Sequence, residues 1–569
     1  MLNLTIAETF RNISRLLEIR QDNPFRIRAY ERAAQAIEGL NEDIEIMAGK
    51  GTLREIPGIG KDLERKIKEF IETGKIRAYE ELKKSFPDGL LELLRIPSVG
   101  PKTAKLLYDE LQIHNVAGLE SAIAKGKLKG IFGIKEKTIK NIASGIRLLK
   151  AGKERMPLSV AWQAAESFLR PLQGLPGLKK ISCAGSLRRQ KETIRDIDIL
   201  VATGTPQRII RHFTRLPQVK EIIASGSTKS SVRTADGIQV DCRAVVEKSF
   251  GAALLYFTGS KNFNIKLRQI AIQKGLKINE YGVFRGNAFV AGRTEAEIFK
   301  LLGMEYIEPE LREDTGEIAL AQKGTLPKLI TQNDLRGDLH THSSWSDGNN
   351  TIQEMAFAAA KLGYSYIAIT DHSQGLKIAN GLSVKDLLKK RKEIEKVNNA
   401  LRRCRVLYGT EVDIDSQGRL DYSNETLKEF DIVIAAIHSG FRQSKEKLTR
   451  RILKACDNKY VNIISHPTGR LWGTRDAYEI DFDAIVAGAR ETNTALEVNS
   501  YPLRLDLNDL HCRRAKEEGV KLVINTDSHA TEHLAAARFG IAVARRGWLT
   551  AKDVLNTLPL DDLLKAIKK

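Results

Sequence analysis

The chain has 569 residues, of which 42% are hydrophobic and 28% are charged, and its formal net charge is +20. This length exceeds one ordinary hydrophobic core, so we expect roughly three or four domains at about 150 residues each. Membrane proteins and exported, disulfide-stapled domains are excluded, because no apolar run reaches the roughly 18 residues of a membrane span, no signal peptide is recognisable, and the five cysteines are far apart. We therefore expect a cytoplasmic protein, and the large positive charge favours nucleic acid as its partner.

Short helical patterns separated by glycine turns fill residues 1–150. Ile56–Ile71 and Ile96–Leu111 repeat an apolar-Pro-x-apolar-Gly pattern followed by an amphipathic helix, and a third copy beginning at Ile131 is degenerate. Such a turn brings backbone N–H groups and a helix N-terminus to a phosphate. The pattern resembles the helix-hairpin-helix motif, and the alternative is an ordinary helix-turn-helix packing element. The residues that this resemblance places against the DNA backbone are Gly58, Gly60, Ser98 and Gly100.

The segment Asn23–Ala34 resembles the opening helix of the small lyase domain of beta-type family X DNA polymerases. In that domain a lysine forms a Schiff base with the sugar left after base loss. The resemblance places Lys66 at the lysine position and Arg26 at the 5′-phosphate site. An amine reacts in this way only when it is deprotonated, which requires burial or neighbouring cations such as Arg65 and Lys68. The alternative for Lys66 is a solvated contact with a DNA phosphate.

Strand-like apolar runs and one helical pattern between residues 155 and 245 predict an α+β domain. Alternation along a strand places Asp196 and Asp198 on one face, and Asp241, in another strand-like run, is the natural third carboxylate. Three such carboxylates can hold two divalent cations about 4 Å apart, which activate a 3′-hydroxyl and stabilise the leaving pyrophosphate. A lone Asp-x-Asp also occurs in surface turns, so the prediction depends on the whole set of residues around it.

That set includes a Gly185–Ser186 turn with donors for a triphosphate and Arg189 to neutralise its oxygens. Together these residues resemble the nucleotidyltransferase palm of family X DNA polymerases. A second block, Tyr256–Gly282, resembles the dNTP-binding segment of that family. The nucleotide-binding residues that the two blocks imply are Gly185, Ser186, Arg189, Tyr256, Phe257, Gly259, Asn264 and Arg268.

The resemblance also implies roles for these residues. The Tyr256–Phe257 turn would crowd a ribose 2′-hydroxyl and so favour deoxynucleotides, Asn264 would face the incoming base, and Arg268 would face the template. Lys261 stands where the vertebrate relatives have an acidic residue. The alternative for these aromatic and basic side chains is core packing and solvated surface.

After residue 337, strand-like runs alternate with helices to the end of the chain, which predicts a parallel barrel or a doubly wound sheet. Histidines and carboxylates follow these runs, so we expect them at the C-terminal strand ends, where barrel enzymes gather catalytic groups. These nine residues are His340, His342, Asp347, His372, Glu411, His438, His466, Asp527 and His529. Nine N and O ligands suffice for three ions of Mn²⁺, Zn²⁺ or Fe²⁺, and a metal-activated hydroxide there would attack a phosphodiester. His511 and His533 lie in helical stretches and are expected on the surface.

The nine residues resemble the ligand set of the polymerase and histidinol phosphatase (PHP) domain, in which every ligand position is then occupied. The resemblance also implies that Asn499 and Arg504 face the scissile phosphate. The alternative is a site that binds metal for stability without turnover.

The order of these segments resembles the bacterial and archaeal family X DNA polymerases over nearly the whole chain. The implied fold is multidomain, with an all-α helix-hairpin-helix domain, an α+β nucleotidyltransferase palm with a thumb, and a C-terminal distorted (βα)7 PHP barrel. The expected segments are a lyase-like domain at 1–90, a fingers-like domain at 91–154, a palm at 155–245, a thumb at 246–324, a linker at 325–337 and a PHP domain at 338–569.

The resemblance implies a DNA-directed DNA polymerase that fills short gaps in base excision repair, with 3′–5′ exonuclease and AP endonuclease activity from the PHP domain. Its partners would be gapped or nicked duplex DNA and dNTPs, with Mg²⁺ or Mn²⁺ in the palm, and we expect a monomer. The alternatives are a polymerase whose PHP domain is only structural, a DNA phosphoesterase whose polymerase-like half only binds DNA, a non-catalytic scaffold and a metabolic phosphatase.

Overall fold

The computed structural model describes residues 2–38, 44–56, 58–87, 89–94, 96, 99–128, 131, 134, 138–139, 142–143, 146 and 155–569. The chain forms two compact units, residues 1–154 with 473–475, and residues 155–472 with 476–569. Within the described ranges no helix is long and apolar enough to cross a membrane. All five cysteines are buried and unpaired, as expected without a disulfide framework.

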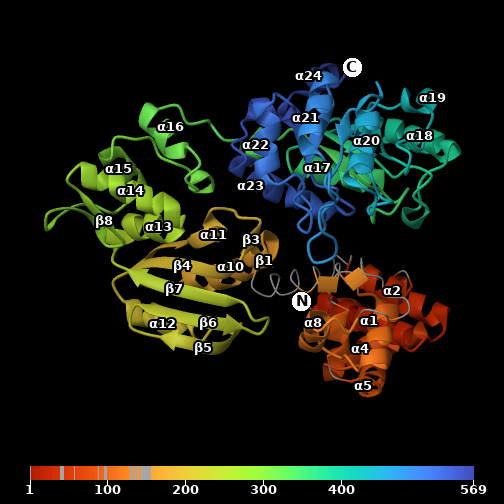
Figure 1. Cartoon of the computed structure of the whole chain (residues 1–569), viewed down its shortest axis with the longest axis horizontal. Helices are drawn as coiled ribbons and strands as arrows, with labels where there is room; N and C mark the ends of the chain where they lie inside the picture. Colours follow the sequence, from red (N-terminus) through yellow and green to blue (C-terminus); the bar gives the residue numbers. More distant parts are fainter. Residues whose placement is uncertain are drawn as a thin grey trace. The chain divides into compact units, whose positions relative to one another are not determined.

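The first unit is helical (Figure 1). Apolar side chains at helical spacing in α1 and its neighbours form one core that includes Phe10, Tyr30, Ile67 and Leu107. Glycines separate the helices: Gly74 adopts φ +69° and ends α4, while Gly60 and Gly100 are the N-caps of α4 and α7. The helices are α1 (Leu2–Ile19), α2 (Pro24–Glu38), α3 (Ile44–Lys50), α4 (Lys61–Thr73), α5 (Arg77–Lys84), α6 (Leu90–Leu93), α7 (Pro101–Leu111) and α8 (Val116–Ala124).

The second unit begins with a five-stranded sheet in the order β2-β4-β7-β6-β5, in which only β4 and β7 are parallel neighbours. Odd residues of β4, such as Ile197 and Ile199, pack with α10 and α12, and even residues, such as Leu200, pack with α13 on the other face. The elements are α10 (Leu158–Gln173), β2 (Leu178–Cys183), α11 (Gly185–Arg188), β4 (Asp196–Thr203), α12 (Pro206–Phe213), β5 (Val219–Ser225), β6 (Lys229–Thr234) and β7 (Gln239–Val245). A short ribbon pairs β1 (Met156–Pro157) with β3 (Thr193–Ile194).

Helices and a small antiparallel sheet follow, with their own core around Phe263 and Phe299. Thr294 begins α15 with a capping box, in which its hydroxyl accepts from the Glu297 N–H and the Glu297 carboxylate accepts from the cap. The elements are α13 (Phe250–Thr258), α14 (Lys261–Gln273), β8 (Lys277–Asn279), β9 (Gly282–Arg285), β10 (Ala288–Ala291), α15 (Glu295–Leu301) and α16 (Glu317–Lys323).

The remainder is a seven-stranded, all-parallel sheet in sequence order. Helices α17 to α22, labelled in Figure 1, come between its strands along the chain. A parallel bridge between Thr341 and Ser528 brings the two edge strands together, so the sheet is a nearly closed barrel. This confirms the predicted (βα)7 architecture. The strands are β11 (Gly337–Thr341), β12 (Tyr366–Ile369), β13 (Arg405–Asp413), β14 (Ile432–Ala436), β15 (Ile463–Ile464), β16 (Ala495–Asn499) and β17 (Leu522–Asn525).

The C-terminal segment closes the end of the barrel at which the strands begin. Asn556 donates to the Gly337 carbonyl at 2.8 Å, and Leu563 packs in a core cluster with Leu339, Ala368 and Ile434. The opposite end, where the strands finish, stays available for a site. The helices are α17 (Ile352–Lys361), α18 (Val384–Ala400), α19 (Asn424–Leu427), α20 (Lys445–Cys456), α21 (Phe482–Glu491), α22 (Asp509–Glu517), α23 (Ala537–Arg546) and α24 (Leu560–Ala566).

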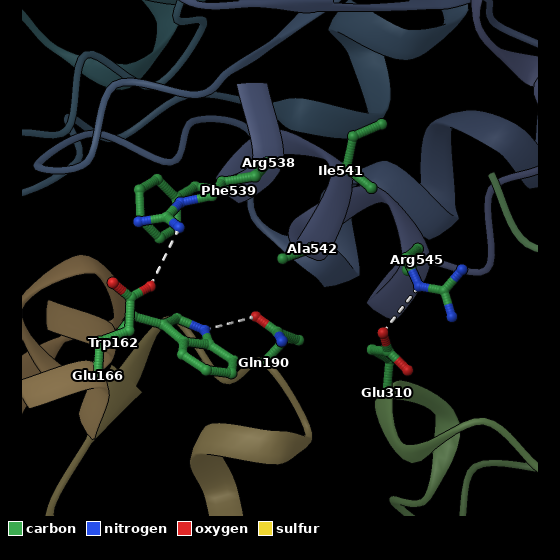
Figure 2. Close-up of a pocket in the computed structure, with 9 residues that line it drawn as sticks. All are labelled: Trp162, Glu166, Gln190, Glu310, Arg538, Phe539, Ile541, Ala542 and Arg545. Carbon is green, nitrogen blue, oxygen red and sulfur yellow. Dashed lines mark hydrogen bonds and ion pairs between the residues drawn. The ribbon is translucent and has the colours of Figure 1, made fainter. Parts of the chain in front are cut away.

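Helix α23 of the barrel faces α10 of the five-stranded sheet across a cavity that Figure 2 shows. An ion pair between Arg538 and Glu166 (3.5 Å) and another between Arg545 and Glu310 (2.7 Å) span it. The residues that line it are Trp162, Glu166, Gln190, Glu310, Arg538, Phe539, Ile541, Ala542 and Arg545.

Candidate active sites

The three predicted aspartates meet on one face of the five-stranded sheet. Asp198 on β4 lies directly opposite Asp241 on β7 in the parallel register, and Asp196 precedes Asp198 by one strand repeat on the same face. Lys229 lies 3.1 Å from an Asp241 oxygen, and the Gln239 amide donates to the other at 3.0 Å. The fold therefore brings the predicted carboxylates together, with two polar neighbours that the sequence did not indicate.

The local field disfavours three ionised carboxylates. Burial, together with the charges of Asp196 and Asp241, raises the pKa of Asp198 to about 7. Carboxylate oxygens are the donors that Mg²⁺ and Mn²⁺ prefer, and a bound cation would relieve this repulsion. The donor set therefore fits the divalent ions expected at this face.

Position 185 requires a glycine because the Asp198 side chain lies directly against it. It adopts φ +63°, and a Cβ built on it would lie 2.3 Å from the Asp198 Oδ2 atom. The Ala184 N–H donates to the Asp198 carbonyl at 2.8 Å, which holds the start of α11 against β4. Gly185 thus allows the Asp198 side chain to occupy its position.

Two arginines at the end of α11 connect the sheet to the next helical region. Arg188 donates to both carboxylate oxygens of Glu295, at 2.8 and 2.6 Å, and to the Thr258 hydroxyl at 2.7 Å. Arg189, predicted to meet a triphosphate, donates to Glu313 at 3.0 Å and to the Thr258 carbonyl. In this structure both arginines position the turn at the end of α13.

The predicted dNTP-binding segment surrounds that turn. Tyr256 and Phe257 occupy the last turn of α13 rather than a loop, and their rings meet edge to face at 5.1 Å. The loop that follows contains Gly259, with φ +69°. The Asn264 amide donates to the Tyr256 carbonyl at 2.7 Å, and Arg268 donates to the Asn264 carbonyl at 3.2 Å.

In the first unit, Lys66 is buried, forms an ion pair with Asp62, and its ammonium lies 5.5 Å from the centre of the Tyr30 ring. The expected cationic neighbours are paired themselves: Arg65 with Asp62 at 2.6 Å, and Lys68 with Glu64 at 3.0 Å.

The same unit contains the residues that are expected to contact DNA. Gly58 adopts φ +83° before the Gly60 N-cap, which is the tight turn expected before a helix N-terminus. Arg26 is exposed and lies 3.7 Å from Asp22. Ser98 lies outside the described residues.

The nine predicted metal ligands gather at the C-terminal ends of the barrel strands. The described residues include three groups of candidate ligands. Within each group, the ligand atoms all lie within 4.8 Å of one another. The groups are His342, Asp347, His372 and His529; His340, His342 and Asp527; and His372, Glu411 and His438. His466 lies beside the last group, with its Nε2 atom 3.1 Å from a Glu411 oxygen.

Several buried atoms of this cluster lack the hydrogen bonds that buried polar groups nearly always make, although His372 Nδ1 and Glu411 Oε2 lie 2.9 Å apart as an ion pair. The atoms that lack these bonds are His340 Nε2, His342 Nδ1 and Nε2, His372 Nδ1, Glu411 Oε2, His438 Nδ1 and His466 Nδ1. Imidazole and carboxylate donors suit Mn²⁺, Zn²⁺ and Fe²⁺. The cluster therefore fits a multinuclear metal centre.

Electrostatics in the cluster are strongly perturbed. Burial lowers the pKa of His342 to about 4, with further lowering by His529 and His372. Burial also opposes the charge on His372, yet Glu411 and Asp347 raise its pKa to about 10. Metal ions bind neutral imidazole, so they would compete with protons here.

Of two residues behind the ligands, Glu497 was not predicted from the sequence, whereas Asn499 was predicted to face the scissile phosphate. Glu497 lies 2.7 Å from His340 Nδ1 and accepts from the His466 N–H at 2.8 Å, so it orients two ligands. The signal for it was an acid inside the apolar β16 run. Asn499 is fully buried and donates to Glu497 and Asp527 at 3.1 Å each, which places it among the ligands.

Arg504 approaches the same centre. Its Nε atom lies 3.4 Å from Asp527 Oδ2, and its Nη1 atom is buried without a partner. His511 and His533, expected on the surface, are half-buried instead, because His511 stacks on Phe482 at 4.0 Å and His533 accepts from the His529 N–H at 3.4 Å.

Comparisons with known proteins cover most of the chain. Family models match at four places: a helix-hairpin-helix domain at 1–76, a SAM-like helix-hairpin-helix tandem at 90–148, the DNA polymerase beta thumb at 253–313 and the PHP domain at 338–500. The DNA polymerase/3′-5′ exonuclease PolX of Bacillus subtilis (strain 168) is 41% identical over 570 residues, which is 99% of both chains.

Two further relatives match parts of the chain. A probable phosphatase of Thermoanaerobacter sp. (strain X514) is 33% identical over 235 residues, or 39% of this chain and 89% of the relative. DNA polymerase lambda of Rattus norvegicus is 27% identical over 345 residues, or 55% of this chain and 56% of the relative.

Proposed function

Because the chain belongs to the PolX family of family X DNA polymerases with a C-terminal PHP domain, we propose that it is a DNA-directed DNA polymerase and 3′–5′ exonuclease. We propose further that it fills short gaps during base excision repair in the cytoplasm, as a monomer acting on gapped or nicked duplex DNA and dNTPs. The segment boundaries predicted from the sequence, from the lyase-like domain at 1–90 to the PHP domain at 338–569, are part of this proposal.

The observation that supports polymerisation is the in-register pairing of Asp198 with Asp241, with Asp196 on the same face. These carboxylates would hold Mg²⁺ or Mn²⁺, which supplies activation of the primer 3′-hydroxyl and stabilises the leaving pyrophosphate. Gly185 leaves room for the Asp198 carboxylate, and Arg188 and Arg189 fix the turn at Thr258. Ser186, Tyr256, Phe257, Gly259, Asn264 and Arg268 complete the proposed nucleotide site.

The observation that supports the nuclease is the cluster of nine ligands with unpartnered buried atoms. These residues would hold Mn²⁺, Zn²⁺ or Fe²⁺, which supplies an activated nucleophile and charge stabilisation at a phosphodiester. The unpartnered Nη1 of Arg504 suits a phosphate oxygen. For Asn499 we propose that it positions the ligand Asp527, because both donors of its amide already have partners.

We propose two finer activities, a lyase activity at Lys66 and an AP endonuclease activity at the PHP centre. Lys66 is buried as a Schiff-base lysine should be, and its side chain is paired with Asp62, so DNA would have to displace Asp62 before the Lys66 nitrogen can attack a sugar. The PHP centre would also support AP endonuclease cleavage, which is the same phosphodiester hydrolysis at another bond. For DNA binding we propose that the phosphate backbone of the DNA is contacted by Gly58, Gly60, Ser98, Gly100 and Arg26.

The test is primer extension and 3′ degradation on a one-nucleotide-gapped duplex with Mn²⁺. Asp198→Ala should abolish extension alone, and His342→Ala should abolish degradation alone. Asp236→Ala and His212→Ala, at exposed positions of the palm, are the matched controls. If extension survives Asp198→Ala, the polymerase-like half serves only to bind DNA; if degradation survives His342→Ala, the PHP centre is structural.

A further inference from the structure

A partly buried ion pair connects the palm to the PHP barrel next to the nuclease centre. The Arg470 guanidinium donates to both carboxylate oxygens of Glu192, at 3.0 and 3.1 Å. The two side chains are only 13% and 16% exposed. Such a bidentate, charge-assisted pair fixes both the position and the plane of the guanidinium.

The other donors of Arg470 hold the loop that carries Arg504. The Arg470 Nε atom donates to the Arg504 carbonyl at 2.8 Å, and Nη2 donates to the Leu505 carbonyl. Leu505 is buried and adopts φ +47°, a conformation that a leucine keeps only when its surroundings impose it. Arg470 therefore fixes the backbone of Arg504 and Leu505.

Arg504 then reaches the metal centre, with Nε 3.4 Å from the ligand Asp527 and Nη1 unpartnered. On the palm side, the start of α10 fixes the backbone of Glu192, because the Leu158 N–H donates to the Glu192 carbonyl at 3.0 Å. We propose that Glu192 of the palm is a positioning residue of the nuclease: through Arg470 it sets the Arg504 loop, so the exonuclease is complete only with the palm docked. This proposal rests on the proposed nuclease function of the PHP centre.

The test compares Glu192→Gln, Arg470→Met, Arg504→Met and the double variant Glu192→Gln with Arg504→Met, all in the full chain with Mn²⁺. Glu192→Gln keeps the side-chain size but removes the charge that orients Arg470. Loss of a partner that orients a metal site typically costs about tenfold or more, so we expect the degradation kcat to fall by about tenfold. The number of bound Mn²⁺ ions should not change.

The matched control is Glu166→Gln. It breaks another ion pair between the palm and the barrel, with Arg538 at 3.5 Å, but this pair borders the cavity in Figure 2 and not the Arg504 loop. If docking alone mattered, both substitutions would slow degradation. We expect Glu166→Gln to leave its kcat and KM unchanged.

The decisive comparison is the double variant. If Glu192 acts through Arg504, Glu192→Gln adds no further loss of kcat once Arg504 is methionine. An additive loss, or an unchanged kcat in Glu192→Gln, overturns the proposal, as does an Arg504→Met variant that degrades DNA normally. Loss of degradation in His342→Ala keeps the proposed nuclease standing in those cases, and survival of degradation in His342→Ala defeats the nuclease itself.

Discussion

Replacing Gly185 by alanine should disable polymerisation through a single methyl group. The new Cβ would lie 2.3 Å from the Asp198 Oδ2 atom, whereas ordinary van der Waals contact begins at 3.4 Å. The carboxylate must therefore move by about 1 Å, the difference between these two distances. A misplacement of about 1 Å at reacting groups costs on the order of 100-fold in rate.

The backbone conformation adds a smaller effect. A non-glycine residue at φ +63° costs about 1–2 kcal/mol, which a folded domain of this size tolerates. We therefore expect Gly185→Ala to fold, to degrade 3′ ends at the wild-type rate, and to extend a primer on gapped DNA about 100-fold more slowly.

Single-turnover extension at saturating dNTP measures this effect, and the nuclease rate of the same preparation reports on folding. Gly204→Ala is the matched control, because a Cβ there meets nothing within 4 Å and the residue lies in the same sheet domain. Extension by Gly185→Ala within a few-fold of wild type would refute the argument that Asp198 must occupy this position.

Three other outcomes follow from the charges and ligands. Because the pKa of Asp198 is raised to about 7, a proton competes with the metal below that pH. The apparent Mn²⁺ affinity measured in primer extension should therefore be constant above pH 7 and fall by up to about tenfold per pH unit below it. An affinity that does not change from about pH 5 to 8 would contradict this. Lys390 is fully buried and lies 2.9 Å from Asp371, so Lys390→Met should lower the free energy of unfolding by about 3–5 kcal/mol in denaturant titrations. Lys389→Met, which removes an exposed ion pair on the same helix, should change it by less than about 0.5 kcal/mol. Removing metal with a chelator should lower the thermal unfolding midpoint, and Mn²⁺ at a hundredfold excess over its Kd should restore about 2.7 kcal/mol of the free energy of unfolding. An unchanged midpoint, together with metal-free protein by elemental analysis, would show that the nine residues bind no ion.

Periodicity accounts for what could be predicted from the sequence. The alternation in Asp196–Thr203 placed two carboxylates on one face, and the strand-like runs after residue 337 placed histidines at strand ends, which the seven parallel strands confirm. These predictions depend on local patterns that one strand carries by itself.

What the sequence did not reveal depends on tertiary contacts. Glu192 and Arg470 are 278 residues apart, and nothing near either residue indicates the other. Likewise, the sequence predicted Arg189 as a triphosphate contact but did not indicate that Glu313 and the Thr258 carbonyl bind its guanidinium. Tyr256 and Phe257 were predicted in a turn, but the apolar run before them extends α13 to Thr258.

The bridge between Thr341 and Ser528 also sets the order in which the two activities arise during synthesis. His340 lies in the first barrel strand and His342 directly follows it, and Asp527 and His529 follow the last strand. The proposed metal centre can therefore form only after β17 has been made. The carboxylates of the palm are all present by residue 241. Because domains fold as they emerge, a chain interrupted before β17 can contain a finished palm but never a finished nuclease.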